Sequence, residues 1–184
     1  MVSVRALVAA AAFLAPALAA GLTTQQIVTG LNGLNEKAKE IKSTATPTDG
    51  TTPKIAALVL TVTSFNAAVI KFTQSAAESA PIQDQAAANQ VADAYHQLTG
   101  GDYFTTIGLI LYDTRAVAAR DDTPSPEAAL PNSLQVTRSS VGHLGQTLAG
   151  VTPPSADKIN ADTQHFQQTV DQATHTGKAP NPSV

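Results

Sequence analysis

The sequence predicts an all-α protein, an antiparallel bundle of five to six amphipathic helices. Three observations lead to this fold class. Apolar residues recur at steps of three and four in several long blocks, which is the period of one buried helix face. Segments rich in proline and glycine separate these blocks. The connecting segments are short, which favours antiparallel neighbours in a bundle.

Residues 1–20 have the layout of a cleavable secretory signal peptide. Arg5 supplies a positive start, residues 6–14 form an unbroken apolar run, and Pro16 precedes the small residues of the segment 17–19. This order matches an export signal with an A-x-A-like cleavage site. The run is shorter than the ~18 apolar residues that a membrane-crossing helix needs. A retained membrane anchor is the alternative interpretation.

We expect residues 21–184 to form a single secreted or wall-associated domain, with a frayed tail from about residue 177. The chain has no cysteine, which excludes disulfides and cysteine-based metal sites. Its formal net charge is −3 and only 4% of its residues are aromatic. A mildly acidic chain without basic clusters argues against binding to nucleic acid or to anionic membranes. No second apolar run is long enough to predict a transmembrane anchor.

The first two predicted helices have the clearest apolar faces. One runs from about Thr24 to Ser43. The other is longer, from about Pro53 to Ser79, with Thr52 placed to cap it. The buried face of the first consists of Ile27, Leu31, Leu34, Ala38 and Ile41. The second carries a heptad repeat of Ile55, Leu58, Val62, Phe65, Val69, Phe72 and Ala76.

Further helices are expected along the rest of the chain. They span about 84–98, 102–120 and 132–149, and a last one follows Ser155, which is placed to cap it. The helix at 102–120 is apolar on most sides, and a strand is the alternative for its segment IGLILY. Each of the other three has a predicted buried face. In chain order these faces are Val91, Tyr95 and Leu98, then Leu134, Val141, Leu144 and Leu148, and last Ile159, Phe166, Val170 and Ala173.

The polar residues do not form a recognisable catalytic or metal-binding motif. Asp93 with His96, and Asp162 with His165, each share a helix face, but a metal needs three or four converging ligands. Surface pairs are therefore favoured. Ser139 or Ser140 with His143 lacks the G-x-S-x-G elbow of a nucleophilic serine. We expect no cofactor and no metal, and a non-enzyme is favoured over an enzyme that uses His96 or His165.

The candidate site is apolar. Large side chains lie on helix faces that should converge, and they form either an ordinary core or the lining of a tunnel that small residues, such as Gly108, Gly142 and Gly145, leave open. In the second interpretation a fatty acid would contact apolar residues and meet polar ones at the mouth. The apolar set is Phe65, Phe72, Tyr95, Phe104, Ile107 and Leu111, and the polar set is Tyr103, Tyr112 and Arg115.

Three segments carry a resemblance to a known family. They are T-x-x-Q-I-V-T-G-L-N-G-L-N-x-K at 23–37, the A-P-I…A-D-A-x-x-x-L pattern at 80–98, and the last helix, ADKINADTQHFQQTV. In these the chain resembles fungal hydrophobic surface-binding proteins and antigenic cell-wall galactomannoproteins. The resemblance implies a secreted or wall-associated helical bundle that binds apolar material. Some members are similar to fatty-acid carriers, and others coat hydrophobic surfaces and recruit secreted hydrolases.

The chain departs from the wall-anchored members of this family. It has no Ser/Thr-rich stalk, and it has no N-x-S/T acceptor because Pro182 follows Asn181. Any sugar would therefore be O-linked, for example at 44–52 or 123–125. The resemblance alone does not identify any ligand-binding residue in this chain.

Overall fold

The computed structural model describes residues 21–45, 55–101 and 129–175. Within these ranges the chain forms five α-helices and one short 3₁₀ helix, with no strand. The helices are α2 (Thr24–Ala45), α3 (Ile55–Ala77), α4 (Gln85–Thr99), α6 (Ala129–Val151) and α7 (Ala156–His175), and the 3₁₀ helix η3 is Pro153–Ser155. The all-α fold class is confirmed.

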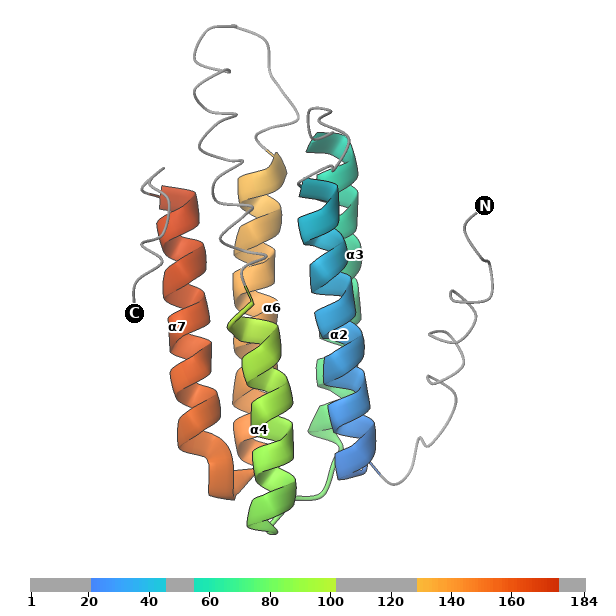
Figure 1. The fold of residues 1–184 in the computed structure, drawn as a ribbon, viewed down its shortest axis with the longest axis vertical. Helices are drawn as coiled ribbons and strands as arrows, with labels where there is room; N and C mark the ends of the chain where they lie inside the picture. Colours follow the sequence, from blue (N-terminus) through green and yellow to red (C-terminus); the bar gives the residue numbers. More distant parts are fainter. Residues whose placement is uncertain (1–20, 46–54, 102–128, 176–184) are drawn as a thin grey trace, which may run out of the picture.

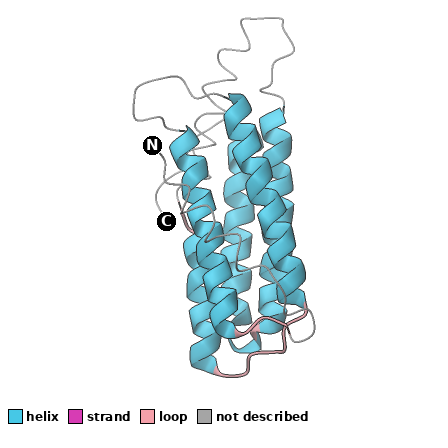
Figure 2. Cartoon of the chain, turned by 90° about the vertical axis from the view of Figure 1, so that its right-hand side faces the viewer, coloured by secondary structure: helices cyan, strands magenta, loops and turns pink. Residues whose placement is uncertain are grey.

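The five helices form a ring in which each packs against two neighbours. The order around the ring is α2, α3, α6, α7 and α4, which returns to α2. Figure 1 shows the long axes of all five nearly parallel, with α4 covering only the lower part of the bundle. The consecutive pairs α2/α3 and α6/α7 run in opposite directions, whereas the neighbours α3 and α6 run in the same direction. The described connections between helices lie together at one end (Figure 2).

A ring of five helices encloses more space than a ring of four. With ~8–10 Å between neighbouring axes, each axis lies about 7–8 Å from the centre, roughly 1 Å farther than in a ring of four. Large side chains are needed to fill this interior. Tyr95, Phe65 and Phe166 are the largest fully buried side chains among the described residues.

The apolar faces predicted from the sequence are the buried faces. Every described member of the five predicted sets has a buried side chain, and these residues belong to one continuous core. The core also includes Ala45, Ala92, Ala94, Leu130 and Val151. The side chains of Ile55 and Ala173, and the predicted cap at 52–53, lie outside the described residues.

The start of α6 differs from the prediction, whereas α7 begins at Ala156, directly after Ser155, as predicted. α6 begins at Ala129 rather than near residue 132, because Pro131 sits in the first turn, where a proline costs no backbone hydrogen bond. The Ser155 hydroxyl donates to Asn89 Oδ1 of α4 at 2.9 Å, so it ties the start of α7 to α4.

One described helix passes a length-and-composition test for crossing a membrane. It is α3, over Ala56–Ala77. In the bundle its heptad face packs against α2 and α6.

Candidate functional site

The interior of the ring is the candidate site, and three of the residues singled out from the sequence belong to its core. Phe65 and Phe72 of α3 and Tyr95 of α4 are all buried. Their predicted contact with a ligand stays a prediction. The remaining apolar candidates (Phe104, Ile107 and Leu111) and the polar ones (Tyr103, Tyr112 and Arg115) lie outside the described residues.

In the lower part of the ring, large side chains fill the space beside the helical glycines. A Cβ atom added at Gly30 would lie 2.2 Å from Cε2 of Phe72, and one at Gly145 would lie 2.6 Å from the Tyr95 hydroxyl. A Cβ atom at Gly142 would lie 2.4 Å from Nε2 of Gln167. The tunnel suggested beside Gly142 and Gly145 is therefore occupied by protein, and this part of the bundle is a filled core.

Tyr95 links three helices through its hydroxyl group. The oxygen lies 3.0 Å from Thr163 Oγ1 of α7 and 3.2 Å from the Val141 carbonyl of α6. Because the Thr163 hydroxyl donates to the Ile159 carbonyl at 2.7 Å, its oxygen is left to accept a hydrogen bond from Tyr95. Burial raises the pKa of Tyr95, and the hydrogen bond between Tyr95 and Thr163 opposes this only in part. The Tyr95 side chain is therefore neutral, and it connects α4 to α6 and α7.

The end of α4 divides the bundle into two parts. Gly30 of α2 lies beside Phe72 of α3, and the two helices run in opposite directions. Five residues farther along α2, Asn35 is therefore level with the preceding part of α3, in the turn that contains Asn66. Asn35 and Gly100 line one depression, so α4 ends at this same level. Above Gly101, no described element lies between α2 and α7.

Several polar side chains are buried at or above this level. Asn66 donates from Nδ2 to the Ser133 carbonyl of α6 at 3.0 Å, and the Thr137 hydroxyl donates to the same carbonyl at 2.9 Å. None of the described buried side chains is charged. Neither Asn66 nor Thr137 was predicted to be buried from the sequence. The sequence signal that could have indicated their burial is a polar residue next to an apolar position of the helical repeat.

Polar and charged side chains link α4 to α7 at the surface of the bundle. His96 Nδ1 lies 2.9 Å from Asp162 Oδ1, and Lys158 pairs with Asp93. The two histidine–aspartate pairs expected within single helices are therefore replaced by pairs between helices. No group of three metal-ligating side chains occurs in the part of the chain that the structure describes.

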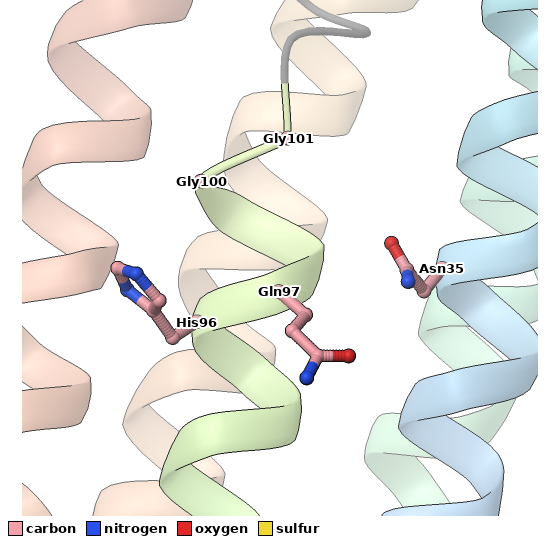
Figure 3. Close-up of a pocket in the computed structure, with 5 residues that line it drawn as sticks. All are labelled: Asn35, His96, Gln97, Gly100 and Gly101. Carbon is pink, nitrogen blue, oxygen red and sulfur yellow. The ribbon is translucent and has the colours of Figure 1, made fainter.

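Figure 3 shows the open depression where α4 ends, which has a volume of about 270 Å³. Gln97 is directed toward Asn35, whereas the His96 ring is directed the other way, toward α7. The imidazole and the two amides do not converge on one point. This arrangement lacks the shared centre that general acid–base catalysis requires.

The described surface has few large exposed apolar side chains. They are Leu60, which is 70% exposed, Val136, which is 49% exposed, and Ile70, which is 45% exposed. Leu60 and Ile70 belong to α3 and Val136 to α6, which is its neighbour in the ring. α3 carries only one charged residue, Lys71, so this outer face is weakly charged.

A comparison with solved structures finds the same fold. The crystal structure of AFMP4P in complex with palmitic acid superposes with a TM-score of 0.70 at 14% sequence identity. The match covers 85% of this chain and 100% of that chain. No protein-family model and no curated protein sequence matches the chain. The likeness establishes the fold.

Proposed function

We propose that this protein binds a long-chain fatty acid or a similar apolar ligand inside the helical ring. The observation that carries the proposal is the ring of five helices around an apolar interior, a fold shared with AFMP4P, whose structure contains palmitic acid. Apolar spaces between the helices of bundles are common ligand sites. Because protein atoms fill the space beside Gly30 and Gly145, we propose that the ligand lies in the other part of the bundle, at and above the level of Phe65.

Gly101 is the last described residue after α4. The residues expected from the sequence to line the ligand (Phe104, Ile107 and Leu111) follow directly, as do the polar candidates Tyr103, Tyr112 and Arg115. We propose that they and Phe65 contact the ligand and that Phe72 and Tyr95 support the site from below. This revises the role expected of Phe72 and Tyr95, because their rings occupy the space beside glycines.

Titration of the delipidated protein with a fluorescent fatty acid tests the proposal. We expect saturable binding at micromolar lipid, and displacement by palmitic acid. Phe65→Ala should weaken binding, whereas the matched variant Leu60→Ala, on the exposed side of the same helix, should not. Native mass spectrometry of protein purified from its own secreting host should show a co-purified lipid. Absence of saturable binding would reject the carrier function.

A second candidate function is adsorption to hydrophobic surfaces with recruitment of secreted hydrolases. The observation in its favour is the weakly charged outer face of α3, where Leu60 and Ile70 are exposed, together with exposed Val136 on the neighbouring helix α6. Three residues fall short of the patch of several hundred Å² that is typical of a strong interaction surface. Replacing Leu60 and Ile70 with Ser should abolish adsorption to polystyrene beads if this function is the main one, and should leave fatty-acid binding unchanged.

We also propose that the protein is exported, is not an enzyme, and belongs to the family of fungal hydrophobic surface-binding proteins and galactomannoproteins. Export rests on the signal-like layout of residues 1–20. The non-enzymatic role rests on the divergent directions of His96 and the nearby amides. N-terminal sequencing of the secreted protein should find Ala20 or Gly21 at its start.

A further inference from the structure

Asn66 is a polar residue in the part of the bundle that we assign to the ligand. The residue is only 5% exposed, and its Oδ1 atom accepts no hydrogen bond from the protein. Buried polar atoms nearly always have a partner, because leaving one unpaired in an apolar interior is unfavourable. A leucine at this position would avoid that penalty and keep a similar volume.

The orientation of the Asn66 amide is fixed by its one hydrogen bond. Nδ2 donates to the Ser133 carbonyl at 3.0 Å. Turning the amide over would place Oδ1 against that carbonyl, and two acceptors would then face each other. The Thr137 hydroxyl cannot supply the missing donor while it donates to the same carbonyl. The free group is therefore an acceptor.

The surroundings of Asn66 restrict the partner that this acceptor can take. Its neighbour in sequence, Phe65, is part of the apolar core, and none of the described buried side chains carries a charge. An ionised carboxylate offers no donor to Oδ1 and would lie in an apolar interior, which is unfavourable for a charge. A neutral O–H group offers a donor and brings no charge.

We propose that Asn66 recognises an O–H group of the bound lipid. This inference rests on the proposed lipid-binding function and narrows its ligand class. The interior then prefers a long-chain alcohol, or a fatty acid in its un-ionised form, to an ester of the same length. Asn66 is a specificity-determining residue of this site.

Competition experiments on the full chain test the assignment. A fluorescent lipid is displaced by hexadecanol, methyl palmitate or palmitic acid, the last at about pH 4 and about pH 8, on either side of carboxyl ionisation. We expect hexadecanol to bind about tenfold more tightly than methyl palmitate, the effect of one well-made hydrogen bond. Hexadecanol binding should not depend on pH. Tighter binding of palmitic acid at the lower pH would identify the un-ionised acid as a second source of the O–H group.

The variant Asn66→Leu should reduce the preference for hexadecanol over methyl palmitate to about twofold or less. Differences in solubility between the two ligands cancel when the wild type and the variant are compared. The matched control is Thr73→Val, on the same helix, because the Thr73 hydroxyl is satisfied by the Val69 carbonyl at 2.8 Å. This control should keep the full preference.

A measurement on the unaltered protein covers the case in which Asn66→Leu fails to fold. The side-chain amide resonance of Asn66 should shift on addition of hexadecanol and not on addition of methyl palmitate. An unchanged preference in Asn66→Leu, or an amide signal that ignores bound hexadecanol, would overturn the inference and leave an ordered water as the partner of Oδ1. Binding of lipid without discrimination rejects this inference alone. Absence of all lipid binding rejects the proposed function, and the inference with it.

Discussion

Below the end of α4, aromatic side chains fill the space beside glycines of the neighbouring helices. Above the end of α4, four described helices enclose buried amide and hydroxyl groups. In the lower part, Phe72 lies against Gly30 and Tyr95 against Gly145. In the upper part, Asn66 keeps a buried, unpaired acceptor beside α6. In the first arrangement, protein atoms occupy the space beside the glycines and gain dispersion contacts there. The upper part retains a buried polar group, which would be absent from a core selected for stability alone.

This difference indicates that the two parts of the apolar interior have different roles. A filled lower core can hold the helices in place whether or not a ligand is bound. The upper part can then carry a ligand without the whole bundle depending on it. The comparison predicts that substitutions below the end of α4 change stability alone, and that substitutions above it change stability in a ligand-dependent way.

Phe72→Ala should have the largest effect. Removing a buried phenylalanine ring costs about 3–5 kcal/mol of unfolding free energy, through lost burial and the cavity left behind. Urea melts should show the same loss with and without fatty acid. Gly30→Ala should be destabilising alone, since its Cβ atom would lie 2.2 Å from the ring, but much less so in the Phe72→Ala background. Additive losses would show that the ring does not depend on the glycine.

Gly145→Ala should follow, with a net loss of about 1–3 kcal/mol from overpacking. The added Cβ atom would lie 2.1 Å from Thr163 Oγ1 and 2.6 Å from the Tyr95 hydroxyl. This loss is expected even though alanine is the better helix former by about 1 kcal/mol. The control is Gly33→Ala on α2, where an added Cβ atom has no neighbour within 4 Å. Gly33→Ala should be neutral or stabilising in the same melts.

Phe65→Ala tests the upper part. If its ring contacts ligand, the free protein should lose only about 1–2 kcal/mol, below the usual cost of deleting a packed ring. The loss should grow when fatty acid is present, because the wild type gains more from binding than the variant does. Equal losses of about 3–5 kcal/mol in both states would place Phe65 in the filled core. The comparison between the two parts of the bundle would then fail.

The sequence predicts the helices and their buried faces because both depend on local periodicity. Ile27, Leu58 and Leu144 are buried as their spacing requires. Periodicity also places Asp93 and His96 on one face of one helix. It contains no information about the neighbouring helix, whose Lys158 and Asp162 become their partners.

The contents of the interior were harder to predict. Gly145 suggested open space, because a sequence shows the absence of a side chain but not which ring from another helix enters the gap. Tyr95 enters it, and the two residues are far apart in the sequence. Asn66 was overlooked for the opposite reason, because a polar residue beside a heptad position normally faces solvent. Its burial results from the packing of α3 against α6.

Tyr95→Phe should have the smallest effect of the four. It removes the hydroxyl contacts to Thr163 and Val141 and keeps the ring, so about 1 kcal/mol should be lost at neutral pH, with lipid affinity unchanged. The pH dependence gives a sharper test. Burial raises the pKa of Tyr95 above its usual value of 10.0, so the folded state holds this proton more tightly than the unfolded state does. The stabilisation is complete below about pH 10 and is lost as the pH rises further. Melts between about pH 8 and about pH 11 should therefore decline less steeply in Tyr95→Phe than in the wild type, and an equal decline would show that the Tyr95 hydroxyl is not buried.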